Sequence, residues 1–166
     1  SAIINFICNQ QAGCGFYETA TQKVYNHLHC YLNIPDTSGR DSLFQAEARR
    51  CKEIIDCINE FPNENHFCIF DELYSGTNPS EAISSAASFL NYLTKNKNVQ
   101  FHLTTHFVKL CKKMKSNKRI TNYCMETKNT ENKLIFKYKL KKGISTIKGG
   151  VHVLINLNYP QEILKS

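Results

Sequence analysis

The hydrophobic pattern of the chain predicts alternating strands and helices. Phe67-Cys68-Ile69-Phe70 is a short continuous apolar run, which is typical of a strand buried on both faces. Residues 99–104 alternate apolar and polar side chains and predict a second strand. Between them, Asn78 and Pro79 followed by Glu81 predict the start of a helix. Because the order is strand, helix, strand, the sequence predicts a parallel βαβ unit with a right-handed crossover.

A second, longer amphipathic helix is predicted upstream, starting at Asp41 and ended by Pro62. Its apolar positions recur at spacings of four, three, four and three residues and form a single stripe, made of Phe44, Ala48, Cys51, Ile55 and Ile58. Residues 3–12 predict a shorter opening helix, and residues 16–34 are rich in strand-forming side chains.

The last third of the chain predicts a different arrangement. Apolar positions from Phe107 to Met114 indicate a helix, and residues 120–127 and 133–140 indicate two strands of a hairpin around a turn at residues 129–132. Gly149 and Gly150 lead into a last apolar helix, and a final helical turn follows Pro160.

Composition restricts the classes of protein to which this chain can belong. With 166 residues, 42% of them apolar, the chain can bury one domain's core, and disorder is excluded as its main state. No apolar run is long enough to span a bilayer, and no signal peptide is visible. The eight cysteines form no C-x-x-C pair, so free thiols are favoured over a zinc site or a disulfide framework. These features predict an intracellular protein in a reducing compartment, cytoplasm or nucleus, of cellular or viral origin.

The net charge of +7 is concentrated in one segment. Residues 1–108 carry a net charge of −4, whereas residues 109–142 carry 12 Lys or Arg against two acidic residues, a net charge of +10. Such a block is either a binding surface for a polyanion or a solvated lysine-rich face of a protein from an AT-rich genome. The sequence leaves both interpretations open.

Polar side chains follow both strands of the predicted βαβ unit. Asp71 and Glu72 come directly after the first strand, in the pattern of a Walker B motif, where an acid can hold Mg²⁺ and its neighbour can polarise water. Thr104-Thr105-His106 ends the second strand. Because ligands bind at the carboxyl ends of parallel strands, we expect these side chains to share one site.

Two further polar segments accompany these strand ends. Residues 38–42, Ser-Gly-Arg-Asp-Ser, precede the long helix, where free backbone N–H groups can bind an anion or Ser42 can serve as an ordinary N-cap. Residues 75–77, Ser-Gly-Thr, form the loop after the two acids.

Taken together and in order, these motifs resemble the ATPase domain of the MutS family of DNA mismatch-repair proteins, a branch of the ABC-type ATPases. The resemblance rests on several motifs and covers nearly the whole chain: Gln11-Ala12-Gly13-Cys14, Ser38-Gly39-Arg40 with Ser42, Phe44 and Glu47, Asp71-Glu72-Leu73 with Gly76-Thr77, Thr105-His106-Phe107, Phe136 to Leu140 with Gly143, and Gly149 to Ile163 with Pro160. The chain departs from the family pattern by the additional Asp41, by Tyr74-Ser75 and by Glu81-Ala82.

The resemblance implies an α/β fold, the parallel-sheet P-loop NTPase core of ABC type with flanking helices and a late β-hairpin. It implies ATP and Mg²⁺ as cofactors, with Asp71 holding Mg²⁺ mainly through water. Glu72 would orient and deprotonate the attacking water, and His106 would sense the γ-phosphate.

The resemblance also implies a paired site. Two ATPase domains face each other as a homo- or heterodimer, with Ser42 and Arg40 acting in trans on the partner's nucleotide. Thr77 belongs to the adjoining loop. Tyr138 stands where the family places a ring near the adenine, with a core or edge-strand aromatic as the alternative. Closure would be communicated to double-stranded, mismatched DNA by domains outside this chain, and no membrane is involved.

No G-x-x-x-x-G-K-[ST] sequence occurs in the 166 residues. We therefore expect residues 1–166 to be a partial MutS-type ATPase domain, with Walker A upstream of Ser1, and the fragment alone to be inactive. Two alternatives stay open: an ABC-type ATPase of the SMC kind, and a catalytically silent module for dimerisation or DNA tethering.

Overall fold

The computed structural model describes residues 6–10, 13–32, 42–130, 133–145, 147, 154–155, 157 and 159–164. The chain divides into two compact units, Ser1–Phe107 and Val108–Ser166, and each is described by itself. The helix expected over residues 3–12 is present at residues 6–10, and its other residues lie outside the described ones.

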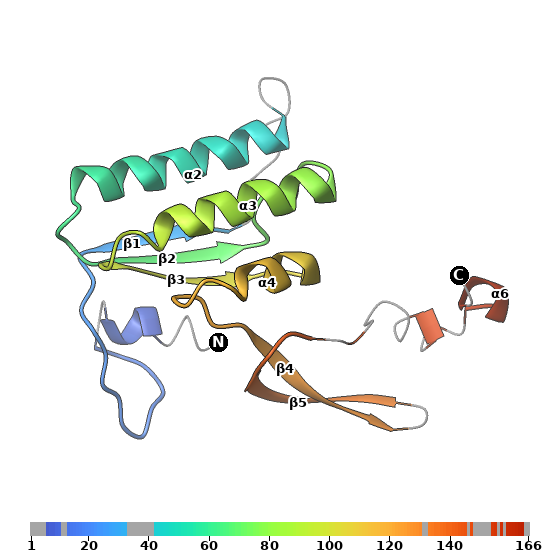
Figure 1. The fold of residues 1–166 in the computed structure, drawn as a ribbon. Coiled ribbons are helices and arrows are strands. Elements are labelled where there is room, and N and C mark those ends of the chain that lie inside the picture. Colours follow the sequence, from blue (N-terminus) through green and yellow to red (C-terminus); the bar gives the residue numbers. More distant parts are fainter. Residues whose placement is uncertain are drawn as a thin grey trace. The chain divides into compact units, whose positions relative to one another are not determined.

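The first unit is built on a parallel three-stranded sheet in the order β1 (His27–Tyr31), β2 (His66–Asp71), β3 (Val99–Thr104). Two helices connect the strands, α2 (Leu43–Glu60) between β1 and β2 and α3 (Pro79–Leu93) between β2 and β3. Both helices cover the same face of the sheet (Figure 1). The parallel βαβ unit expected from the sequence is therefore confirmed, and a second one precedes it.

The central strand β2 is buried on both faces, as its apolar run predicts. Phe70 packs edge to face against Phe89 of α3, at 5.4 Å between ring centroids. Phe67 and Ile69 point to the opposite face, where they form a core cluster with Tyr25 and are packed by Phe6. Burying each such side chain stabilises the fold by roughly 1.5–3 kcal/mol. Strand β2 therefore contributes to the packing on both faces of the sheet.

Helix α3 begins as the sequence predicts. The Asn78 side chain accepts hydrogen bonds from the backbone N–H groups of Ser80 and Glu81, and Pro79 occupies the first helical position. Of the predicted core positions, Ile83 is only half-buried, while the helix buries Ala82, Ala86, Ala87, Phe89, Leu90 and Leu93.

The predicted stripe of α2 is partly wrong. The helix starts at Leu43 and buries four side chains, Glu47, Cys51, Ile54 and Ile58. Phe44, Ala48 and Ile55 are only half-buried at the edges of that stripe. The prediction considered only apolar side chains and therefore left out Glu47. This carboxylate can lie at the centre of the buried face because it accepts three hydrogen bonds there.

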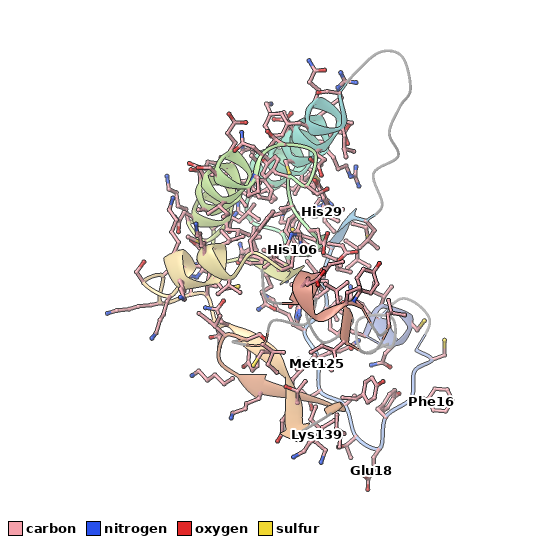
Figure 2. All side chains as sticks on the ribbon, turned by 90° about the vertical axis from the view of Figure 1, so that its right-hand side faces the viewer. Phe16, Glu18, His29, His106, Met125 and Lys139 are labelled. Atoms are coloured by element: carbon pink, nitrogen blue, oxygen red, sulfur yellow. The ribbon has the colours of Figure 1, made fainter. Side chains whose placement is uncertain are left out.

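The expectation of a strand-rich segment over residues 16–34 is also largely wrong, because within its described residues only β1 is a strand. Residues 13–26 form an irregular connection in which Phe16 and Val24 are exposed. Figure 2 shows Phe16 projecting away from the ribbon. Strand-forming side chains do not make a strand where no neighbouring strand offers a ladder of hydrogen bonds.

The second unit contains α4 (Val108–Met114), the strands β4 (Tyr123–Thr130) and β5 (Lys133–Lys142), and α6 (Gln161–Leu164). The two strands pair antiparallel, with an irregularity between Met125 and Thr127, so the predicted hairpin is confirmed. Its connection is shorter than expected, because Asn129 and Thr130 belong to β4. The helical turn after Pro160 is confirmed, whereas Gly149 and Gly150 lie outside the described residues.

Among the residues that the structure describes, no helix combines the length and the apolarity needed to cross a membrane. All eight cysteines are free thiols. Cys51 and Cys68 are buried as expected, whereas Cys14 and Cys30 are exposed.

Candidate active site

Two carboxylates end the central strand. Asp71 is the last residue of β2, and Glu72 follows it, both of them exposed. The backbone N–H of Glu72 donates to the carbonyl of Thr104 at 3.1 Å, and the Thr104 hydroxyl donates to Asp71 Oδ1. The pairing of β2 with β3 thus extends one residue past β2 and holds both acids beside the end of β3.

His106 lies beside Glu72, as the sequence predicts. Its Nδ1 is 3.1 Å from Glu72 Oε1, and both side chains are at least half exposed. Because a carboxylate only accepts, Nδ1 carries the proton of this hydrogen bond. The preceding turn is fixed by Thr105, whose hydroxyl accepts from the Phe107 N–H at 3.0 Å. The carboxyl ends of β2 and β3 therefore present an acid, a second acid and an imidazole together.

The backbone after β2 is strained. Glu72 has a φ of 53° and Tyr74 a φ of 58°, in the left-handed region that side chains other than glycine rarely occupy. Each such conformation costs about 1 kcal/mol or more and persists only where the surroundings impose it. Strain of this kind is concentrated at functional sites, which agrees with the chemistry of the residues held here.

Glu47, which belongs to the motif at residues 38–47 that resembles the family pattern, is the buried support of this loop. Its carboxylate, only 2% exposed, accepts from the Ser75 N–H at 2.9 Å, the Ser75 hydroxyl at 2.8 Å and the Gly76 N–H at 3.0 Å. Burial raises the pKa of the neighbouring Tyr74, and burial raises that of Cys51 to about 11, so both stay protonated around the carboxylate. A signal was available in the sequence, because a single acid stands in the otherwise apolar face of α2.

The loop after the acids also touches the start of α2. A Cβ built on Gly76 would lie 2.7 Å from both the backbone N of Phe44 and the Cγ of Leu43, so only glycine fits without a shift. Ser42 is the N-cap of α2, with its side chain accepting from Gln45 and its N–H donating to the Gln45 side chain. The ordinary N-cap interpretation of Ser42 is confirmed, and its role in trans stays a prediction.

The remaining candidate residues are not brought to the two acids by any described contact. Thr77 donates to Glu81 at 2.7 Å, at the start of α3. Tyr138 lies on β5, a strand of the two-stranded sheet of the second unit, and is 83% exposed with a φ of 53°, so it is an edge-strand aromatic and not a core one. Arg40 lies outside the described residues.

The donor set at the end of β2 suits a hard cation. Asp71 and Glu72 offer exposed carboxylate oxygens, and the neighbouring Thr104 offers a hydroxyl. Mg²⁺ prefers such oxygen ligands, keeps several waters and uses only one or two carboxylates. The residues present therefore fit the Mg²⁺ ion that the resemblance implies.

Comparisons with known proteins point to one family. The family described as MutS domain V matches residues 2–166. The DNA mismatch repair protein MutS of Bacteroides fragilis is 32% identical over 145 residues, which are 86% of this chain and 16% of that protein. The MutS proteins of Clostridium perfringens and Aquifex pyrophilus are 28% and 26% identical over 78% and 68% of the chain, each over 14% of its own length. The chain thus spans about a sixth of the relatives that it matches, and it belongs to the MutS family, in which it corresponds to domain V.

Proposed function

We propose that this chain is the ATP-hydrolysing part of a MutS-like DNA mismatch-repair protein, with the P-loop NTPase core of ABC type. The observation that carries the proposal is the group of Asp71, Glu72 and His106 at the carboxyl ends of two adjacent parallel strands. The relatives that it matches are named DNA mismatch repair proteins.

The roles of the side chains follow from their chemistry. A bound Mg²⁺ neutralises phosphate charge, and Asp71 would hold it, mainly through water. Glu72 has two carboxylate oxygens, so it can hold His106 through Oε1 and accept a proton from the attacking water at Oε2. His106 would present its other ring nitrogen, Nε2, to the terminal phosphate. Positioning and charge stabilisation would supply most of the rate acceleration.

A second copy, identical or related, would complete each nucleotide site. Ser42 and Arg40 would act on the partner's nucleotide from the start of α2, and Thr77 would line the adjoining loop. Tyr138 would stack near the adenine, for which its exposed ring is suited. Closure of the dimer on ATP would change how other domains bind mismatched DNA.

The proposal places the Gly-rich phosphate loop outside these 166 residues, since none of them contains its sequence. The chain alone would then turn over no ATP. Measurable hydrolysis by the purified 166-residue chain would contradict this part of the proposal.

The test is a Glu72→Gln variant of the protein that carries both this chain and the Gly-rich loop. Loss of the general base should lower kcat by at least about 10²-fold, while ATP affinity stays within a few-fold of the wild type. Glu53→Gln, a change of an exposed acid on α2, is the matched control and should leave kcat unchanged. A loss of less than tenfold for Glu72→Gln would remove Glu72 from this role.

A second candidate function rests on the second unit. Residues 109–142 hold 12 basic side chains against two acidic ones, and Lys139 projects from the β4–β5 hairpin (Figure 2). A silent module that tethers DNA would use this charge directly. It predicts DNA affinity that falls steeply with salt and weakens when Lys139, Lys141 and Lys142 are changed to Gln, without any need for Glu72.

A further inference from the structure

A second cluster of polar side chains lies at the amino end of the sheet, opposite to Glu72 and His106. His27 and His66 are the first residues of β1 and β2, and Cys57 stands in the last turns of α2. Each of the three offers a ligand atom within 4.8 Å of the others. The three residues come from separate elements, so the fold and not local sequence brings them together.

The distance between Cys57 and His27 matches that between two ligands of one metal ion. Cys57 Sγ lies 3.7 Å from His27 Nδ1. Tetrahedral zinc, with Zn–S of about 2.3 Å and Zn–N of about 2.0–2.1 Å, places a sulfur and a nitrogen about 3.6 Å apart. The sulfur and the nitrogen can therefore reach a common ion without moving apart.

The other ring nitrogen of His27 is held as in known metal sites. His27 Nε2 donates to Glu64 Oε2 at 2.6 Å, which leaves the lone pair on Nδ1, the atom that faces the thiol. Metal-binding histidines almost always donate their second N–H to a carboxylate or a carbonyl in this way, which fixes the tautomer and raises the basicity of the ligand.

His66 is prepared in the same manner. It is fully buried, and its Nε2 donates to the carbonyl of Phe61 at 2.9 Å, so its Nδ1 carries the lone pair. That lone pair accepts a hydrogen bond from His29 Nε2–H at 3.1 Å, so a metal ion on Nδ1 would replace this hydrogen bond, and His29 is the nearest further imidazole. The rings of His27 and His66 are stacked 12° from parallel, so a shared ion requires both to tilt about the Cβ–Cγ bond, a torsion with a broad minimum.

We propose that Cys57, His27 and His66 bind a transition-metal cation of the zinc class, with His29 or a water as the fourth ligand. The thiolate and two imidazoles are ligands that zinc prefers. Bound metal would tie the end of α2 to the starts of β1 and β2, at the end of the sheet away from the nucleotide chemistry.

Acidic side chains surround the three proposed ligands. Glu60 follows Cys57 by three residues at the end of α2, and Glu64 accepts from His27. The same carboxylates attract a divalent cation, whose charge compensates the thiolate. Charge and geometry thus point to the same kind of ligand.

The experiment titrates the chelator-treated protein with Co²⁺ and then with Zn²⁺. We expect a thiolate-to-cobalt charge-transfer band in the near ultraviolet together with the visible bands of tetrahedral cobalt, both removed by Zn²⁺. Cys57→Ser should abolish the charge-transfer band, whereas Cys30→Ser, a change of an exposed thiol on β1, should keep it.

A Glu64→Gln variant keeps all the ligands and tests the site even where Cys57→Ser fails to fold. Losing the carboxylate that accepts from His27 should weaken Co²⁺ affinity about 10- to 100-fold. The proposal is overturned if the wild-type protein shows no charge-transfer band, if Cys57→Ser retains it, or if Glu64→Gln binds Co²⁺ as tightly as the wild type.

Discussion

The two ends of the parallel sheet use the same types of side chain in opposite environments. At the carboxyl end, His106 is paired with Glu72 at the surface, and both are at least half exposed. At the amino end, His66 is fully buried, and His29 is only 8% exposed. Burial, followed by the charges of His66 and His27, lowers the pKa of His29 to about 4. The imidazole of His106 is therefore open to solvent at one end, whereas burial favours the neutral form of His29 at the other.

The difference shows where each end obtains its order. The exposed acids at the carboxyl end can give up their present hydrogen bonds to bind a ligand. The loop that follows them therefore needs a buried support, and Glu47 supplies it by accepting hydrogen bonds from Ser75 and Gly76. At the amino end the imidazole rings are ordered by their own hydrogen bonds, between His29 and His66 and from His27 to Glu64. Changes under the loop should therefore alter the carboxyl end and leave the amino end intact.

The largest effect is expected for Glu47→Ala. This change leaves the Ser75 N–H, the Ser75 hydroxyl and the Gly76 N–H without their acceptor and opens a cavity under the loop. We expect the free energy of unfolding to fall by about 3 kcal/mol. Each unpaired buried donor costs about 1–3 kcal/mol, and the total stays at this level because Ser75 is exposed and its donors can bond to water instead. Urea denaturation measures this loss.

The matched variant is Glu47→Gln, which keeps the size of the side chain and one acceptor oxygen. About half of the loss should return, since the amide NH₂ faces N–H donors in place of the second oxygen. A fall of less than about 1 kcal/mol for Glu47→Ala would show that the loop is held without this carboxylate.

A smaller effect is expected for Gly76→Ala. The added Cβ would meet the Phe44 backbone N and the Leu43 side chain at 2.7 Å, and a backbone atom cannot move as a side-chain tip can. Overpacking of this kind costs about 2 kcal/mol, so the midpoint of thermal unfolding should fall. Gly13→Ala is the informative control, because a Cβ there meets nothing within 4 Å, although the φ of +64° adds its own strain. Equal stability of Gly76→Ala and the wild type would show that the loop and α2 separate freely.

Much of the fold was predictable because it depends on local pattern. The apolar run of β2, the alternation of β3 and the Asn78-Pro79 cap each determined an element within a residue or two. The placement of Asp71, Glu72 and His106 also followed, since strand ends in a parallel sheet share one edge.

What the sequence did not show depends on contacts between distant segments. Glu47 is buried because a loop 28 residues later supplies its donors. The amino-end cluster joins His27 to Cys57 across 30 residues and to Glu64 across 37. The strand-forming residues 16–26 stay irregular for the same reason, since only a neighbouring strand would make them a strand.

The smallest effect is expected for Ser42→Ala at the start of α2. The change removes the N-cap acceptor of the Gln45 N–H, while Gln45 can still reach the backbone of residue 42. The free energy of unfolding should fall by about 1 kcal/mol. Ser42→Asp supplies a new cap and should restore stability, whereas a role of Ser42 in trans requires its hydroxyl. If Ser42→Asp recovers the stability of the protein and not its ATP turnover, Ser42 has a function beyond the cap. Recovery of both stability and turnover would show that Ser42 serves only as the N-cap. The chemistry at the carboxyl end of the sheet would then depend on Glu72 and His106, without Ser42.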